Sequence, residues 1–221
     1  MVLILAIGDL HTPHRALDLP APFRKLLMPG KIHMVLCTGN LTMSDTADWL
    51  RSIAPTVHIV QGDLDTLSST SAPHPLFKVV AVGPLRIGLI HGHSLVPVDD
   101  TESLAMAARQ LDVDVLVSGA SSMGVDCFEF EGRFFVNPGS ATGTGGAAGN
   151  AFPGAPTEAA NQTPSFVLMD VVDTKVTAYV YQCEVGSDEV KIVKLEYVKP
   201  AASAESPAGA AAVGADGQLA A

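Results

Sequence analysis

Short apolar runs that stop near a glycine recur along the first part of the chain. Residues 2–6, 34–38 and 57–60 form three such runs, and a glycine follows each within two residues. Runs of aliphatic and β-branched residues of this length are typical of strands buried on both faces. Apolar residues at helical spacing lie in two intervening segments, 20–28 and 44–53. The pattern predicts strands connected by helices, with the carboxyl end of each strand opening into a loop.

The pattern changes in the second half, where helical spacing is confined to residues 100–111. The other apolar runs are short, and turn residues separate most of them, as in hairpins. They occupy 77–82, 85–90, 113–117, 127–130, 133–136, 165–170, 175–182 and 190–197. A few helices combined with many hairpins favour two sheets packed as a sandwich and flanked by helices, rather than one uniformly parallel doubly wound sheet.

The composition predicts one domain with two added segments. At 221 residues the chain can bury one substantial core, which we assign to residues 1–200. Residues 143–163 are rich in Gly, Ala and Pro and hold almost no large apolar side chains, so we expect a flexible insertion. Residues 201–221 are rich in Ala but contain a single Leu, so they have little to pack against the domain. We expect this tail to be disordered.

The charge of the chain excludes some classes of partner. It has 13 Lys and Arg against 23 Asp and Glu, which gives a net charge of -10. Because clustered cations are needed to bind nucleic-acid phosphates or anionic lipids, neither is an expected partner. The longest apolar run, at the N-terminus, is far shorter than the ~20 residues of a membrane-spanning helix and lacks the basic flank of a secretory signal. We therefore expect a cytosolic protein.

The three cysteines, Cys37, Cys127 and Cys183, are widely spaced and form no CxxC pair. Their number and spacing do not indicate a disulfide framework. No neighbouring base marks any of them as a nucleophile. We expect three reduced, buried thiols.

Side chains that can bind metal gather at the ends of the predicted strands. Asp9 and His11 follow the first run, Asn40 the second and Asp63 the third, and His91 ends a later strand. Ligands of α/β sheets bind at the carboxyl ends of strands, and carboxylate and imidazole groups are common metal ligands. Alternatively, Asp9 caps a turn and His11 is an ordinary loop residue. The agreement of several strand ends favours a site.

In chain order the strand-end groups are Asp9-x-His11, Gly39-Asn40, Gly62-Asp63-x-Asp65, His91-Gly92-His93 and Gly119-Ala120-Ser121-Ser122. Their order and spacing resemble the DxH, GD, GN, H and GHxH motifs of the calcineurin-like metallophosphoesterases, over most of residues 1–200. The resemblance implies an α/β fold, a two-sheet α/β/β/α sandwich of the metallophosphoesterase type. Enzymes of that family hydrolyse phosphoesters with two divalent cations, a bridging carboxylate and a metal-activated hydroxide.

The resemblance also reveals departures from the family's ligand set. Asp9, His11 and His91 are retained, but Asn40 stands where the family has its bridging Asp, and Asp63 where it has Asn. Both imidazoles of the GHxH block are missing, so each cation loses a ligand. We therefore expect Asp9, His11, Asn40, Asp63 and His91 to form a vestigial site that binds Zn or Mn weakly. The expected protein is a pseudoenzyme with no catalytic residues and no required cofactor.

A closer resemblance is to one family within this fold, the small subunits of the retromer coat. It rests on the segments 8–15, 29–32, 37–40, 87–93, 137–143 and 164–170. It implies a non-catalytic scaffold that is held on a long α-solenoid subunit and serves retrograde transport of cargo from endosomes to the Golgi. The protein would then lie peripherally on endosome membranes through this complex, without direct insertion. An active metal-dependent phosphoesterase is the alternative.

Strand alternation gives an independent indication of a binding surface. Val176, Ala178 and Val180 share one face of a predicted strand, whereas Tyr179 and Tyr181 share the other. If the valine face packs inward, the tyrosines point outward. Either a helix or loop covers them, or they belong to an exposed apolar patch of the kind that marks a partner site.

The retromer resemblance favours the exposed patch and implies two surfaces. One would bind regulators, a TBC-class Rab GTPase-activating protein and an ankyrin-repeat Rab effector. Its residues are Leu3, Leu26, Leu168, Tyr179, Tyr181 and Ile192. The large solenoid subunit would contact Leu95, Val96 and Pro97, in a loop on the face that holds the vestigial metal site. Two sites on different faces are what a scaffold requires.

Overall fold

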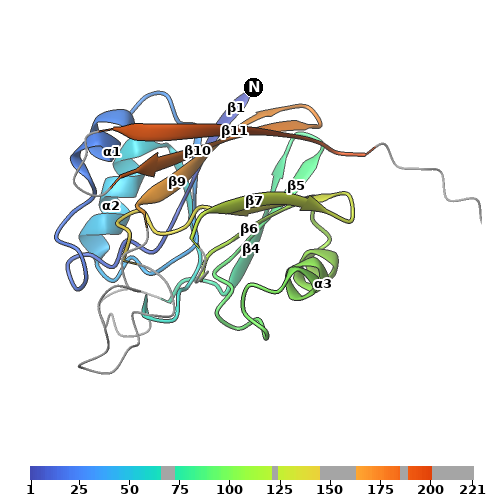
Figure 1. Cartoon of the computed structure of the whole chain (residues 1–221), viewed down its shortest axis with the longest axis horizontal. Coiled ribbons are helices and arrows are strands. Elements are labelled where there is room, and N and C mark those ends of the chain that lie inside the picture. Colours follow the sequence, from blue (N-terminus) through green and yellow to red (C-terminus); the bar gives the residue numbers. More distant parts are fainter. Residues whose placement is uncertain (66–72, 121–123, 145–162, 185–188, 201–221) are drawn as a thin grey trace, which may run out of the picture.

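The computed structural model describes residues 1–65, 73–120, 124–144, 163–184 and 189–200. Two β-sheets lie face to face, with helices on their outer sides (Figure 1). In chain order the elements are β1 (Val2–Ile7), α1 (Ala21–Leu26), β2 (Met34–Cys37), α2 (Ser44–Ile53), β3 (Thr56–Ile59), β4 (Phe77–Val82), β5 (Leu85–Ile90), α3 (Thr101–Leu111), β6 (Val115–Ser118), β7 (Asp126–Phe130), β8 (Arg133–Asn137), β9 (Ser165–Val172), β10 (Lys175–Cys183) and β11 (Val190–Val198). The predicted two-sheet sandwich is confirmed.

Each sheet mixes parallel and antiparallel strands. The larger sheet has the order β11-β10-β9-β1-β2-β3, and the smaller one has the order β4-β5-β6-β8-β7. β1, β2 and β3 are parallel, with Leu5 beside Val35 and Val35 beside Val57. β5, β6 and β8 are likewise parallel. The carboxyl ends of neighbouring parallel strands therefore lie together, which places the predicted strand-end groups close in space.

The main core fills the space between the two sheets. Val176, Ala178 and Val180 of β10 point into it, as the alternation predicts. Tyr197 of β11 links the two sheets, because its ring stacks on Phe134 with centroids 5.2 Å apart. The Tyr197 hydroxyl donates a hydrogen bond to a backbone carbonyl in the β7–β8 turn at 2.7 Å. Burial of these groups fixes how the sheets face each other.

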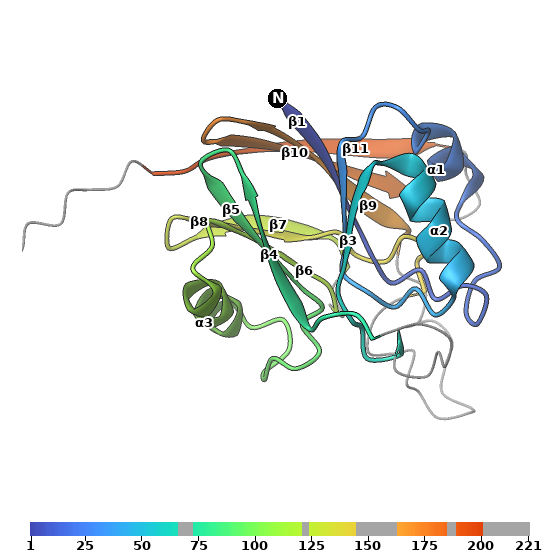
Figure 2. The ribbon, with the colours of Figure 1, turned by 180° about the vertical axis from the view of Figure 1, so that it is seen from behind.

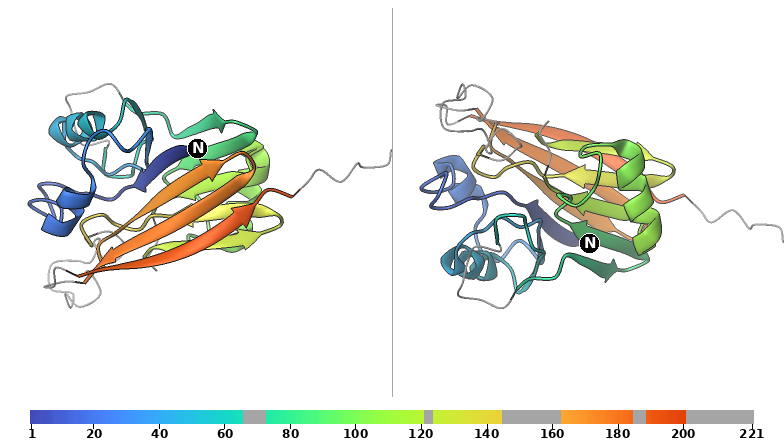
Figure 3. Two further views of the ribbon diagram at one scale, coloured as in Figure 1. Left: turned by 90° about the horizontal axis from the view of Figure 1, so that it is seen from above. Right: turned by 90° about the horizontal axis from the view of Figure 1, so that it is seen from below.

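The helices cover only part of the outer faces. α1 and α2 pack on the larger sheet through Phe23 and Leu50, and α3 packs on the smaller sheet through Ala105 and Ala108 (Figure 2). Seen from above, β10 and β11 have no described helix over their outer face (Figure 3). Helices α1 and α2 lie at one end of the molecule, and α3 lies at the other end. This arrangement leaves one sheet face partly open.

Capping residues fix both ends of α3. The carboxylate of Asp100 accepts a hydrogen bond from the backbone N–H of Ser103 at 2.9 Å, which satisfies one of the free N–H groups of the first turn. Asp112 adopts the left-handed conformation with φ of 51° and ends the helix. The fixed start of α3 also anchors the loop that joins it to β5.

The predicted flexible insertion at 143–163 is described only at its ends, and the predicted tail at 201–221 lies outside the described residues. Both therefore stay predictions. Among the helices that the structure describes, none has the length and apolar character needed to span a bilayer.

All three cysteines lie within the described residues and are buried thiols, as predicted. Burial raises the pKa of Cys37 and of Cys127 to about 12. Because the thiolate is the reactive species, these two side chains are inert at neutral pH.

Candidate functional site

The carboxyl ends of β1, β2, β3 and β5 bring together the five side chains predicted as a metal site. Asn40 lies at the centre, with its amide nitrogen 2.8 Å from Asp9 Oδ1 and 2.9 Å from Asp63 Oδ1. His91 Nε2 lies 3.1 Å from the same oxygen of Asp63. His11 Nε2 is more distant, at 3.7 Å from Asp9 Oδ1. Four of the five are buried, and Asp63 opens to solvent.

The orientation of the Asn40 amide decides what this cluster can bind. Its oxygen accepts a hydrogen bond from the backbone N–H of Leu64 at 3.0 Å, so its nitrogen faces the carboxylates. The amide N–H groups then donate to Asp9 and Asp63. A hydrogen-bond donor therefore lies between the two carboxylates, where a metal ion would have to approach.

The backbone at the cluster adopts a conformation that is uncommon for residues other than glycine. Asp9, His11 and Asn40 have φ angles of 48°, 48° and 57°. The N–H of Asp9 donates to the carbonyl of Gly39 at 3.1 Å, and the N–H of His11 donates to the carbonyl of Asn40 at 2.9 Å. Such conformations persist only where surrounding contacts enforce them, and they cluster at functional sites.

Two residues that hold this cluster in place are not among the predicted metal ligands. Asp65 accepts hydrogen bonds from the backbone N–H groups of Asn40 at 2.7 Å and Gly62 at 2.8 Å. Ser140, in the turn after β8, donates to the carbonyl of Asp9 at 2.7 Å. The sequence shows both residues within motifs, Asp63-x-Asp65 and an Asn-Pro-Gly-Ser turn, but it contains no signal for their distant partners.

Contacts within the cluster shift its pKa values. The hydrogen bond with His91 holds the pKa of Asp63 well below its usual value, so this carboxyl is ionised at neutral pH. Burial lowers the pKa of His91, but the hydrogen bond with Asp63 and the charge of Asp9 outweigh burial and raise it overall. Burial lowers the pKa of His11. The Asp63 carboxylate is therefore paired with His91 inside the cluster.

These residues do not fit a two-cation centre. The Asn40 amide directs N–H groups, rather than an oxygen lone pair, toward the carboxylates. In the block that corresponds to GHxH, Gly119 and Ala120 offer no metal ligand, and 121–122 lie outside the described residues. Across the described ranges, no group of three or more His, Cys, Asp or Glu side chains is placed to hold a metal ion.

The predicted large-subunit contact lies in the loop between β5 and α3. Val96 is 85% exposed, and Pro97 is also exposed. Leu95 is half-buried against the apolar cluster of α3, so it anchors the loop. Because His91 directly follows β5, the loop borders the carboxylate cluster.

The predicted regulator patch lies on the outer face of the larger sheet. Its residues come from β1, α1, β9, β10 and β11 and are Leu3, Leu26, Leu168, Tyr179, Tyr181 and Ile192. The strand register sets Tyr179 beside Leu168 and Tyr181 beside Ile192. Tyr181 stacks on the buried ring of Phe166 with centroids 4.7 Å apart. None of the six is fully buried, and Leu26 and Ile192 are about half exposed, at 48% and 54%.

Comparison with known proteins places this geometry in a family. The profile of the calcineurin-like phosphoesterase superfamily domain matches residues 2–174. The chain is 38% identical over 199 residues to vacuolar protein sorting-associated protein 29 of Schizosaccharomyces pombe. The aligned region covers 90% of this chain and 100% of that relative.

Solved structures agree with the sequence comparison. Vps29 of Chaetomium thermophilum is 46% identical, with a TM-score of 0.76 over 90% of this chain and 98% of that one. Vps29 of Entamoeba histolytica, determined in complex with Zn²⁺, is 39% identical, with a TM-score of 0.73 over 88% and 99% of the two chains.

Proposed function

Because the chain belongs to the Vps29 family of the calcineurin-like phosphoesterase superfamily, we propose that it is a non-catalytic scaffold subunit of the retromer coat. In this role it binds the large α-solenoid subunit and regulators during retrograde transport of cargo from endosomes to the Golgi. It reaches endosome membranes peripherally, through the complex. Weak Zn or Mn binding at the carboxylate cluster is compatible with this role and is not required by it.

The single observation that carries the proposal is the Asn40 amide, which donates to Asp9 and Asp63 at 2.8 Å and 2.9 Å. Hydrolysis by two cations needs a bridging carboxylate at such a position, because an anionic oxygen must ligate both ions. A neutral amide that turns its nitrogen to the site supplies neither charge nor lone pair. The Asn40 side chain that stabilises the carboxylates is therefore also the group that supplies no bridging ligand for two cations.

Two observations favour the phosphoesterase alternative. Asp9, Asp63 and His91 converge at the strand ends, and a 39% identical relative was solved in complex with Zn²⁺. We expect the purified protein, assayed with Mn²⁺ and an aryl phosphodiester, to turn over no faster than its Asp9→Ala variant, because the bridge and two imidazoles are missing. Calorimetric titration with zinc measures the affinity of the same purified protein for the metal. Turnover clearly above that of Asp9→Ala would favour the enzyme.

The proposed regulator surface has a specific test on β9. We expect Leu168→Glu to reduce capture of a TBC-class Rab GTPase-activating protein or an ankyrin-repeat Rab effector at least tenfold, since a carboxylate buried in an apolar contact is costly. Capture of the large subunit should not change, because that contact lies in the β5–α3 loop. Pull-down with each partner measures both.

A matched control is Val172→Glu, on the same strand and 43% exposed in the structure. It adds the same charge outside the six-residue patch and should leave regulator binding intact. Equal loss with both variants would show that the effect is not specific to the patch.

A further inference from the structure

The outer face of the larger sheet carries its side chains in rows that run across the strands. One row joins Leu168 of β9 to Tyr179 of β10, and the row on one side of it holds Tyr181 and Ile192. The row on the other side holds Asp170 of β9. Neighbouring rows lie roughly 7 Å apart, because a strand rises about 3.4 Å per residue and every second side chain shares a face. A carboxylate therefore borders two apolar rows.

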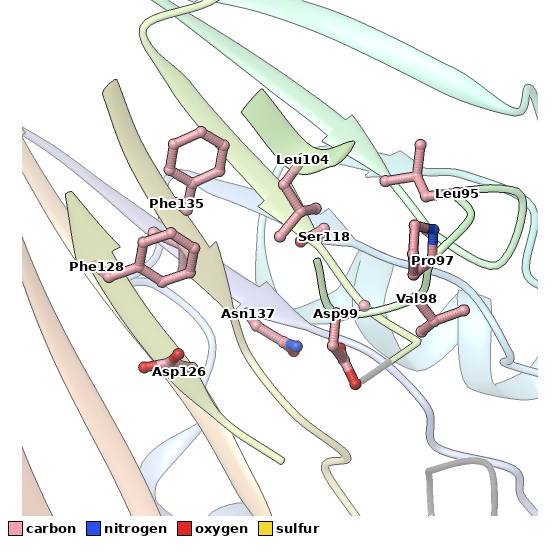
Figure 4. A pocket seen from close by; sticks show the side chains of 13 residues that line it. Leu95, Pro97, Val98, Asp99, Leu104, Ser118, Asp126, Phe128, Phe135 and Asn137 are labelled. Atoms are coloured by element: carbon pink, nitrogen blue, oxygen red, sulfur yellow. The ribbon is translucent and has the colours of Figure 1, made fainter. Parts of the chain in front are cut away.

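This face is open where the smaller sheet is covered. No described helix lies over β10 and β11 (Figure 3), whereas α3 packs on the outer side of the smaller sheet. Beside α3 a cavity of about 160 Å³ remains, lined by Leu95, Leu104 and Phe128 among others (Figure 4). It is well below the roughly 300–1,000 Å³ of pockets that enclose drug-sized ligands. The rows on the larger sheet instead offer a surface on which a partner segment can lie across several strands.

The Asp170 carboxylate on this surface is incompletely paired. Its Oδ1 atom is buried and finds no hydrogen-bond donor in the part of the chain that the structure describes. The side chain as a whole is half-buried, so a partner can still approach it from the solvent. A carboxylate that has lost part of its hydration without gaining a donor is destabilised. It therefore gains from a cation that comes close.

Two lysines of the same face are already engaged by another carboxylate. Lys175 and Lys194 contact Glu196 of β11, with Nζ–Oε distances of 2.7 Å and 2.6 Å. These contacts lower the pKa of Glu196 to about 2, so its charge is balanced within the chain. Glu196 lies opposite Thr177, which in turn lies opposite Asp170. The same row across the sheet thus holds a paired carboxylate and one that a partner's cation can complete.

We propose that a regulator binds this face through a basic residue that contacts Asp170 and an apolar residue that packs on Leu168 and Tyr179. The two lie one residue apart in an extended segment of the partner, because residues i and i+2 present their side chains on the same side, roughly 7 Å apart. The net charge of -10 favours the approach of a basic segment. This inference rests on the proposed function, which assigns regulators to this face, and adds the charge that they bring.

Asp170→Asn tests the contact, because it removes the charge and keeps the shape of the side chain. We expect its affinity for the purified TBC-class Rab GTPase-activating protein, measured by calorimetry on the full chain, to fall about tenfold at low salt. The loss should be smaller at high salt, since screening weakens the contact in the unmodified protein. The thermal midpoint should not fall, because an amide costs less to bury than a carboxylate.

Asp173→Asn is the matched control. It removes the same charge from an exposed residue in the turn between β9 and β10, and Asn readily adopts the φ of 50° found there. This variant should bind the regulator as the unmodified protein does. An equal loss with both variants would assign the effect to net charge and overturn the proposal. Normal binding by Asp170→Asn at both salt concentrations would overturn it as well, as would a loss that does not depend on salt.

The proposed function fails in a different way. If Leu168→Glu loses the regulator but Asp170→Asn does not, the regulator surface stands and only the basic residue is overturned. Failure of the unmodified chain to bind, or normal binding by Leu168→Glu, would contradict the proposed regulator surface and, with it, this inference.

Discussion

Replacing Val96 by aspartate is expected to abolish capture of the large retromer subunit, with at least a hundredfold loss of affinity. Val96 is 85% exposed in a loop that Leu95 anchors to α3, so it is free to enter a partner's surface. A carboxylate at the centre of an apolar contact loses its hydration without gaining a partner, which costs several kcal/mol. Pull-down and calorimetry with the purified large subunit measure the loss.

The fold should tolerate this substitution, because Val96 buries almost none of its surface. Circular dichroism melting should therefore give the same midpoint for Val96→Asp as for the unmodified chain. Val198→Asp, at a 57% exposed valine of β11, serves as the control for an added charge and should bind normally. If Val96→Asp melts early, the assignment of this side chain to a free surface is wrong.

The largest effect on stability is expected at Phe166, which is completely buried between two aromatic rings. It contacts Phe23 of α1 edge-on and stacks on Tyr181, each at a centroid distance of 4.7 Å. We expect Phe166→Ala to lower the free energy of unfolding by about 3–5 kcal/mol, because it removes both contacts and leaves a cavity. Urea denaturation gives the value directly.

Phe166→Leu should cost less, about 1–2 kcal/mol, since most of the volume is retained. Both variants should weaken regulator binding, because Tyr181 loses the aromatic ring of Phe166 that orients it. Regulator binding is best measured on folded protein at low temperature. A regulator affinity unchanged in Phe166→Leu would show that Tyr181 needs no such support.

Most of the fold could be predicted from the sequence, because the burial of one face of a strand or helix sets a regular spacing of apolar residues along the chain. The alternation of Val176 and Ala178 with Tyr179 correctly assigned the two faces of β10. Asp100 lies where the helical spacing begins and caps α3. The two-sheet arrangement followed from the change from helices to hairpins near the middle of the chain. In each case a local signal agreed with the tertiary contacts.

The sequence predicted which residues form the carboxylate cluster, but not how their polar groups are oriented. The motifs indicated that Asp9, Asn40 and Asp63 meet, because parallel strands align their ends. The direction of the Asn40 amide depends on the N–H of Leu64, and no pattern of residue types specifies such a contact. Ser140 supports Asp9 across 131 positions, which is equally invisible in a single sequence. The orientation of polar groups needs the assembled structure.

The amide between Asp9 and Asp63 also has a consequence for the shape of this rim. Because Asn40 donates hydrogen bonds to both carboxylates, a donor within the chain satisfies them and the rim does not need imidazoles from the loop after β6 to keep its outline. Ala120 is therefore accommodated at a position where the resemblance to the superfamily would place a histidine.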